Sequence, residues 1–509
     1  MKPMPPPPPS HPILTCEETR DFEANYFRGD EAAEWTAMRR AGLALAAAVL
    51  RDFQEIGGFP ADGRVLVLAG KGHNGGDALI AAQAILEKFP AATADVEFVF
   101  GQRALRPLAM RAWRELQHAA RERVCAVGPT AGRAPKPTGG RFYSLSLDGV
   151  FGFQFRPPLD ERATQALRRA NALPIRFRAA VDLPSGLGDE GAFRADFTYA
   201  TGVVKQPVVD GSHAAFVGRL RYLDLGFFDD KDLASRLRVL TPAVLAPLAA
   251  LRAPDSDKRT YGHVFVLGGS RNYPGAVLMT VLAALRSGAG LVTAFVPESF
   301  VAAFAARAPE AMWIGWPETV AGGLALEGQH LLRARLERAS ALVIGPGLGG
   351  ELETRALVAD IVKTSPVPLV LDADALQPDI VRAGTAPRVL TPHLGEFRRI
   401  LAGDDFHDAA PTKDAVVVVK GRLTAISQSG RGYYSLAGGP VLARGGSGDV
   451  LAGLIGGLLA QTPADPLLAA GRGALWHGLA ADALARAHGQ TAVVTTQQLD
   501  FLSPVLREL

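Results

Sequence analysis

Short apolar runs that end in glycine or aspartate turns recur through both halves of this chain of 509 residues. In the first half, residues 64–69 (RVLVLA) fit a buried strand, residues 70–77 a loop and residues 78–88 a helix. In the second half, similar apolar runs occupy residues 264–267, 341–344 and 369–371. Strands that end in such turns bring ligand-binding groups to the carboxyl edge of a parallel sheet. We therefore predict an α/β fold with two three-layer α/β/α domains.

The length of the chain and its proline-rich stretches predict where the domains lie. At roughly 100 to 200 residues per domain, 509 residues allow two or three domains. The stretch 229–254 begins with Asp-Asp-Lys-Asp and carries three prolines, so we place the boundary near residue 231. Five consecutive prolines near the start predict a disordered or polyproline extension over residues 1–12. The predicted domains are residues 13–231 and residues 232–509.

Charge, cysteine content and hydropathy exclude several kinds of partner. The net charge is +3 and no run of Lys or Arg alternates with aromatic residues, so we expect no nucleic acid partner. The two cysteines, Cys16 and Cys125, are too few for a disulfide framework and fit a reducing cytoplasm. No apolar run reaches the roughly 18 residues of a membrane span, so we expect no membrane partner. We expect a cytoplasmic homo-oligomer, because apolar helices such as residues 451–459 often associate.

The turn at residues 445–449 (GGSGD), which leads into an apolar segment, is the most specific signal of a ligand site. Glycines let backbone N–H groups approach a phosphate, and the positive end of the helix dipole adds to the attraction. An acid in this place needs a role: Asp449 takes a proton from an attacking hydroxyl, or it meets a metal ion that carries a nucleotide. The alternative is a glycine-rich helix cap in which Asp449 is only a first-turn residue.

A G-x-G-x-x-G pattern at residues 70–75 is weak when taken alone. A dinucleotide-binding dehydrogenase carries an acid at the end of the next strand, but that segment ends in Phe-Gly at residues 100–101. Residues 74–77 (NGGD) instead offer an amide, N–H groups and a carboxylate in one turn. This combination suits a phosphate or ribose on one side and a cation on the other.

Two more acidic turns follow apolar segments of the first half, at Asp148 (DGVFG) and at Asp182 (DLPSG). An Asx turn or a helix cap is the alternative interpretation of either aspartate alone. Three successive strand ends that carry oxygen ligands favour a binding site.

With these motifs, residues from about 14 to 230 resemble the YjeF N-terminal family of NAD(P)H-hydrate epimerases, whose domain is Rossmann-like. The resemblance implies that a potassium ion is held by Asn74, Asp148 and Ser185. It implies that the hydrated nicotinamide nucleotide faces Asn74, Gly75, Gly76, Asp77 and Asp182. Asp182 is the implied proton-transfer residue. The chain departs from the family pattern, at positions that are not implied ligands, at His73, Ala78 and Gly149.

Five motifs of the second half agree on another family. They are GGS with YPGA within residues 268–276, GAGLV at 288–292, GPGLG at 345–349, TPHLGE at 391–396, and KG at 420–421 before the GGSGD turn. Residues from about 258 to 506 thereby resemble the NAD(P)H-hydrate dehydratase branch of the ribokinase-like superfamily. The chain has Ser435 in a region where that family often has Asn.

The second resemblance implies two sets of contacts. The hydrated nucleotide would contact Ala276, Gly347, His393 and Asp449. The adenine nucleotide would be held by Lys420, Gly421, Arg422, Leu423, Thr424, Gly445, Gly446, Ser447 and Gly448. The alternatives are that His393 is a turn residue bonded to a neighbouring carbonyl, and that Lys420 is a strand-end charge that reaches solvent.

Together, the two resemblances imply a bifunctional enzyme of nicotinamide nucleotide repair. The first domain would use K⁺ and epimerise the R and S forms of the hydrates NADHX and NADPHX. The second would dehydrate the S form with ADP or ATP and Mg²⁺, Asp449 taking the proton of the hydrate hydroxyl as that oxygen attacks the terminal phosphoryl group. Two alternatives stay open: a kinase of a hydroxyethylthiazole or hydroxymethylpyrimidine vitamin precursor, and a first half that is a non-catalytic nucleotide-binding module.

Overall fold

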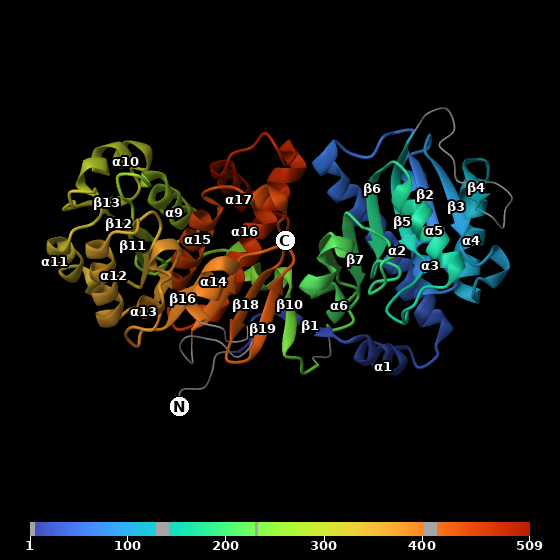
Figure 1. Cartoon of the computed structure of the whole chain (residues 1–509), viewed down its shortest axis with the longest axis horizontal. Coiled ribbons are helices and arrows are strands. Elements are labelled where there is room, and N and C mark those ends of the chain that lie inside the picture. Colours follow the sequence, from blue (N-terminus) through green and yellow to red (C-terminus); the bar gives the residue numbers. More distant parts are fainter. Residues whose placement is uncertain (1–5, 129–141, 230–232, 402–414) are drawn as a thin grey trace. The chain divides into compact units, whose positions relative to one another are not determined.

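The computed structural model describes residues 6–128, 142–229, 233–401 and 415–509. The chain divides into two compact units (Figure 1). The first unit comprises residues 11–235 with the short segment 486–489, and the second contains the rest of the described chain. The boundary predicted near residue 231 lies outside the described residues, and the two units divide between Ser235 and Arg236. No helix of the described residues is long and apolar enough to cross a membrane.

The first unit is built on a 7-stranded parallel sheet with the order β4-β3-β2-β5-β6-β7-β9. Its strands are β2 (Arg64–Ala69), β3 (Thr93–Phe98), β4 (Val124–Val127), β5 (Tyr143–Gly149), β6 (Ile175–Val181), β7 (Phe197–Thr201) and β9 (Arg219–Leu223). Its longer helices are α1 (Cys16–Phe27), α2 (Glu31–Asp52), α3 (His73–Lys88), α4 (Pro107–Ala120) and α5 (Glu161–Ala172). Outside this sheet, β1 (Ser10–Leu14) pairs in parallel with β8 (Val204–Lys205).

Alternate residues of β2 enter two different cores. Val65 and Val67 pack with α2, α3 and α4, whereas Leu66 and Leu68 pack with α5. Because successive side chains of a strand point to opposite faces of the sheet, helices cover both faces. The first unit is therefore a three-layer α/β/α domain, as predicted.

The sheet of the second unit has the order β13-β12-β11-β14-β15-β16-β17-β18-β19-β10. Its strands are β10 (Leu237–Leu240), β11 (His263–Leu267), β12 (Leu291–Pro297), β13 (Met312–Trp316), β14 (Ala341–Ile344), β15 (Leu369–Leu371), β16 (Arg388–Leu390), β17 (Val416–Val419), β18 (Thr424–Gln428) and β19 (Arg431–Ser435). Strands β13 to β17 are parallel, and β18 is antiparallel to both of its neighbours. The helices around it include α9 (Pro274–Arg286), α12 (Leu352–Thr364), α13 (Pro378–Val381), α14 (Leu394–Leu401), α15 (Ser447–Gln461) and α16 (Pro466–His488).

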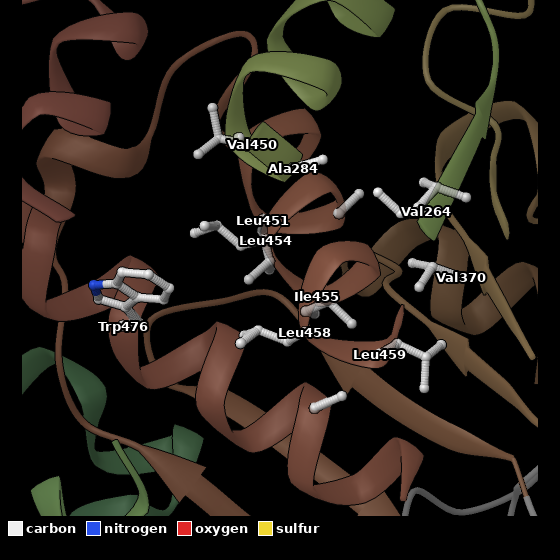
Figure 2. Packing of buried hydrophobic residues seen from close by; sticks show 14 of the residues in the cluster. Val264, Ala284, Val370, Val450, Leu451, Leu454, Ile455, Leu458, Leu459 and Trp476 are labelled. Atoms are coloured by element: carbon white, nitrogen blue, oxygen red, sulfur yellow. The ribbon is translucent and has the colours of Figure 1, made fainter. Parts of the chain in front are cut away.

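This sheet also lies between two layers of helices. Val264 and Val266 of β11 join a core with α9, α15 and α16, whereas Phe265 and Leu267 join one with α12, α13 and α14. Figure 2 shows side chains of α15 in the first of these cores, together with Val264 from the sheet and Trp476 from α16. The predicted three-layer architecture is thus confirmed for the second unit as well.

Two local predictions need correction. Helix α3 begins at His73, so residues 74–77 form its first turn instead of the predicted loop. Residues 10–12, which we predicted to lie in a disordered extension, belong to strand β1. There the backbone has a partner strand, because Ile13 and Leu14 of β1 pair with Val204 and Lys205.

Candidate active sites in the two units

The glycine-rich turn of the first unit brings α3 close to the carboxyl edge of the sheet. A Cβ atom on Gly70 would lie 1.9 Å from the carbonyl oxygen of Val150, so only glycine permits this approach. Gly75 and Gly76 of the first helical turn are buried in the packing of α3. The polar residues of the same turn, Asn74 and Asp77, line a cavity.

The three predicted potassium ligands lie around the backbone of Phe151. The amide nitrogen of Asn74 donates to the carbonyl oxygen of Phe151 over 3.3 Å and to that of Val181 over 2.9 Å. The N–H of Phe151 donates to the hydroxyl oxygen of Ser185 over 2.8 Å. The N–H of Ser185 donates to a carboxylate oxygen of Asp148 over 2.8 Å. The structure therefore brings Asn74, Asp148 and Ser185 together.

The surroundings of Asp148 fit a bound monovalent cation. Burial raises the pKa of Asp148 to about 6, although hydrogen bonds from Ser185 and from the N–H of Val150 oppose this shift. Among the described residues, the groups that oppose it are hydrogen-bond donors and include no charged side chain. A cation beside this carboxylate would offset the cost of its burial. No cluster of three or more metal-binding His, Cys, Asp or Glu residues occurs in the described chain, so the amide, hydroxyl and carboxylate oxygens suit K⁺ better than a transition metal.

Asp182 forms a buried ion pair with Lys205, the side chains being 3% and 1% exposed. The hydroxyl of Thr201 donates to Asp182 over 3.3 Å, and the carbonyl oxygen of Thr201 accepts from Lys205 over 3.2 Å. Asp182 has a φ of 68°, which non-glycine residues adopt rarely. The backbone and these partners together fix the carboxylate at the cavity wall.

Two further carboxyl groups share this cavity. Burial, followed by the negative charges of Asp182 and Glu23, raises the pKa of Asp77 well above its ordinary value. Burial raises the pKa of Glu23 to about 7 against the opposing charge of Lys205. One carboxyl oxygen of Asp77 is buried without a hydrogen-bond partner. Both groups therefore carry protons near neutral pH, beside the ion pair of Asp182 and Lys205.

The carboxyl groups open into one cavity of about 510 Å³. Lys71, Arg106 and Arg156 also line it, so its walls combine acid–base groups with positive charge that suits an anionic ligand. The sequence analysis did not identify Glu23 and gave Lys205 no role. Glu23 lies on α1, and no spacing in the sequence indicates which residues of that helix face the cavity.

In the second unit, α9 and α15 approach closely enough to position Asp449. A Cβ atom on Gly453 would lie 2.1 Å from the carbonyl oxygen of Thr280. The hydroxyl of Thr280 donates to the carbonyl oxygen of Asp449 over 3.2 Å and to that of Ala276 over 3.1 Å. A Cβ atom on Gly347 would lie 3.1 Å from that of Ala276. The structure thus brings together three of the four residues that we expect to contact the hydrate.

Lys420 and Asp372 form an ion pair beside the glycine-rich turn. Nζ of Lys420 donates to Oδ1 of Asp372 over 2.9 Å, and the hydroxyl of Thr391 donates to the same oxygen over 2.7 Å. A Cβ atom on Gly448 would lie 3.0 Å from Nζ, so the ammonium group lies against the turn. Burial alone would lower the pKa of Lys420, but the charge of Asp372 raises it above its ordinary value. The alternative in which Lys420 reaches solvent is therefore wrong.

Asp449 has the proton affinity of a general base that works near neutral pH. Burial and the negative charge of Asp372 raise the pKa of Asp449 to about 7, with a further contribution from Asp374 and an opposing one from Lys420. Asp374 accepts a hydrogen bond from the N–H of Gly349 over 2.9 Å. The sequence analysis treated the aspartates after residues 369–371 only as a strand end and missed this influence on Asp449.

The predicted nucleotide-binding residues occupy two neighbouring turns. Residues 420–423 connect the antiparallel strands β17 and β18, and Thr424 begins β18. The carbonyl oxygen of Gly445 accepts a hydrogen bond from Thr495 over 2.7 Å, and Gly446 has a φ of 90°. Helix α15 starts at Ser447 without a side-chain cap, so its first N–H groups are available to a ligand.

His393 lies beside Lys420 and caps a helix. The two residues form a parallel β-bridge. Nδ1 of His393 accepts hydrogen bonds from the N–H groups of Gly395 and Glu396, over 3.0 and 3.3 Å, at the start of α14. The alternative of a turn histidine is thus partly correct, with N–H groups in place of the expected carbonyl. The imidazole is 62% exposed, and its contact with the hydrate stays a prediction.

Ser435, the departure from the second family, ends β19. Its hydroxyl oxygen is buried without a hydrogen-bond partner. Nothing in the structure explains the serine at this position.

Comparison with known proteins matches each unit to a family model. The model described as YjeF-related protein N-terminus matches residues 36–207, and the one described as NAD(P)H-hydrate dehydratase matches residues 264–503. A solved structure described as an ADP/ATP-dependent NAD(P)H-hydrate dehydratase from Bacillus subtilis, co-crystallised with ATP and Mg²⁺, is 29% identical with a TM-score of 0.44. That match covers 51% of this chain and 93% of the other.

Curated relatives match almost the whole chain. The bifunctional NAD(P)H-hydrate repair enzyme of Gloeobacter violaceus is 36% identical over 505 residues, which are 94% of each protein. The enzyme of the same name from Moorella thermoacetica is 34% identical over 498 residues, which are 93% of this chain and 92% of the relative. These matches cover both units, which favours this family over the vitamin-precursor kinases. The chain belongs to the family of bifunctional NAD(P)H-hydrate repair enzymes.

Proposed function

We propose that the second unit dehydrates the S form of hydrated NADH or NADPH at the expense of ADP or ATP. The observation that carries this proposal is the carboxyl group of Asp449, which has a pKa of about 7 and lies in the first turn of α15. Asp449 takes the proton from the hydroxyl group of the hydrate. The hydroxyl oxygen then bonds to the terminal phosphorus as the bond from that phosphorus to the rest of the nucleotide breaks, so that AMP leaves from ADP, or ADP from ATP.

The phosphate ester formed in this way is unstable. The lone pair of the ring nitrogen expels phosphate from the neighbouring carbon, and the next ring carbon loses a proton. The ring double bond returns and NADH or NADPH is restored. Phosphate is a far better leaving group than hydroxide, so the phosphoryl transfer provides the driving force for dehydration.

Two features of the second unit support the transfer. The N–H groups at the start of α15 and the ammonium group of Lys420 face the same turn, where they stabilise negative charge on the transferred phosphoryl group. Mg²⁺ bound by the nucleotide phosphates needs only one or two protein carboxylates, and it would neutralise charge on them. Asp374 suits this role, because its carboxylate makes no ion pair with another described residue and its charge acts on Asp449.

The test is Asp449→Asn, which keeps the shape of the side chain and removes the base. We expect loss of nucleotide consumption and of NADH recovery from S-NADHX, measured in parallel by phosphate release and absorbance. Asp255→Asn, at an exposed position of the same unit, is the control and should behave as the wild type. Near wild-type rates with Asp449→Asn would show that this carboxylate is not the base.

For the first unit, we propose epimerisation of the hydrates, with Asp182 moving the proton of the hydroxyl group at the reacting carbon. Asp182 is held by Lys205 at the wall of the cavity that Asp77 and Glu23 share. The two protonated carboxyl groups supply proton donors on the same cavity surface, which the return of the hydroxyl group to the other face requires. K⁺ would be held by Asn74, Asp148 and Ser185, and it would supply positive charge beside the turn that carries Phe151.

The epimerase proposal is tested without nucleotide, so that the dehydratase is silent. Pure R-NADHX is incubated with K⁺ and the appearance of the S form is followed by chromatography. We expect Asp182→Asn to slow this conversion to near the spontaneous rate and Asp21→Asn, an exposed position on α1, to leave it unchanged. An unimpaired Asp182→Asn variant would contradict the assigned role.

A further inference from the structure

The first unit contains a second cavity, of about 500 Å³, next to the one that holds Asp182. The two cavities share the residues of one short segment, residues 152–156, which we call the strap. Beyond the strap, the second cavity is lined mainly by apolar side chains of the segment that follows Asp182 and by His213. Its volume lies within the roughly 300 to 1,000 Å³ typical of small-molecule sites.

The strap is held in place from the first cavity. The ring of Phe155 lies 4.9 Å from that of Phe151, and Nζ of Lys205 lies 5.5 Å from the ring centre of Phe153. Phe153 and Phe155 line both cavities. The ion pair at the catalytic wall and the second cavity therefore contact the same two aromatic rings.

Arg156 stands where the two cavities meet. Its guanidinium group donates to the carbonyl oxygens of Phe153 and Phe155, over 3.1 and 2.8 Å. These bonds use one of its terminal nitrogens, and the side chain lines both cavities. The planar guanidinium group, with donors to spare, suits a phosphate that passes from one cavity to the other.

The lining of the second cavity suits a flat heterocycle. Aromatic and aliphatic surfaces come from the strap and from Leu183, Pro184 and Leu187. Hydrogen-bonding groups at its rim include His213, whose Nδ1 lies 3.0 Å from the carbonyl oxygen of Pro207. Bases bind proteins by stacking on such surfaces and by a few polar contacts at their edges.

We propose that the second cavity binds the adenosine half of the hydrated dinucleotide, while the first cavity holds the nicotinamide half and Arg156 contacts the pyrophosphate between them. The inference rests on the epimerase function proposed above. The match between two adjoining cavities of nearly equal volume and a ligand made of two nucleoside halves supports it.

The test compares two substrates, NADHX and the corresponding hydrate of reduced nicotinamide mononucleotide, which lacks the adenosine half. Leu187→Trp fills the second cavity with a bulky side chain, and His213→Ala removes a polar group from it; neither residue lines the first cavity. We expect each variant to lower kcat/KM for epimerisation of NADHX by about tenfold, mainly through KM, and to leave kcat/KM for the mononucleotide hydrate unchanged. Glu190→Trp, an exposed position near Leu187 that lines neither cavity, is the matched control.

The two substrates separate the possible failures. A loss for NADHX alone supports the second cavity as the adenosine site. Equal effects on both substrates, or no effect on either, would overturn the inference while leaving the epimerase function intact. If the wild-type chain epimerises neither hydrate, the epimerase function itself is wrong and the inference falls with it.

Discussion

Nζ of Lys420 lies 2.9 Å from Oδ1 of Asp372, and the same ammonium group lies against Gly448 of the glycine-rich turn. Asp372 is buried and also accepts a hydrogen bond from Thr391. Its charge raises the pKa of Lys420 and that of Asp449. One buried carboxylate thus positions the cation at the anion site and sets the proton affinity of the base.

Asp372→Asn should separate these two effects. Loss of the negative charge removes one cause of the raised pKa of Asp449, so the base ionises at lower pH. Lys420 also loses its partner, and we expect dehydratase kcat to fall by on the order of a hundredfold. The measurement is kcat against pH, in which the acid limb of the variant should lie below that of the wild type. An acid limb that does not move would contradict the link between Asp372 and Asp449.

Lys420→Met should move the acid limb in the opposite direction. The positive charge of Lys420 lowers the pKa of Asp449, so its removal leaves a carboxylate that ionises at higher pH. In the wild type, only ionised Asp449 accepts a proton, and the dehydratase rate should therefore rise with pH through about 7 and level off above it. Residual activity of the variant suffices for the profile. Shifts of Lys420→Met and Asp372→Asn in the same direction would contradict the electrostatic account.

The potassium site should weaken as the pH falls through about 6. Burial raises the pKa of Asp148 to about 6, so below that value the carboxyl group becomes neutral and attracts a cation less. We expect the K⁺ concentration that gives half-maximal epimerase rate to rise severalfold between pH 7.5 and pH 5.5. Asp148→Asn should abolish this pH dependence. The same half-saturation at both pH values in the wild type would show that Asp148 does not bind the ion.

The contact between α9 and α15 should tolerate no side chain at Gly453. A Cβ atom there would lie 2.1 Å from the backbone carbonyl of Thr280, so the helices must separate to accept Gly453→Ala. We expect a loss of about 1 to 3 kcal/mol in the free energy of unfolding of the second unit, measured by urea denaturation. Gly350→Ala is the control, because an added Cβ would meet no atom within 4 Å. Equal stability of the two variants would contradict the close contact.

The sequence predicted the sheets better than the sites. Apolar runs such as residues 64–69 and 341–344 are strands with the predicted bounds, because a buried parallel strand leaves a continuous apolar segment. The start of α3 was wrong, since Asn74 and two glycines favour a turn when tertiary packing is not considered. The cytoplasmic location and the homo-oligomer stay predictions.

Residues that act through distant partners could not be found in this way. Glu23 lies far along the chain from Asp77 and Asp182, and only the fold brings its charge close to theirs. Asp372 follows a strand and was visible as an acidic turn, but its pairing with Lys420 depends on neighbouring strands of the folded sheet. Motifs predicted the glycines and acids of each turn, whereas burial and electrostatic coupling required the structure.

The central claim is that one chain carries two activities in two separate sites. It is tested most directly by adding racemic NADHX, K⁺, Mg²⁺ and ADP or ATP to the wild-type chain, to Asp182→Asn and to Asp449→Asn, and following the recovery of NADH. We predict full recovery with the wild type, recovery that stalls near half with Asp182→Asn, and none with Asp449→Asn. Full recovery by Asp182→Asn at the wild-type rate, or any rapid recovery by Asp449→Asn, would contradict the account.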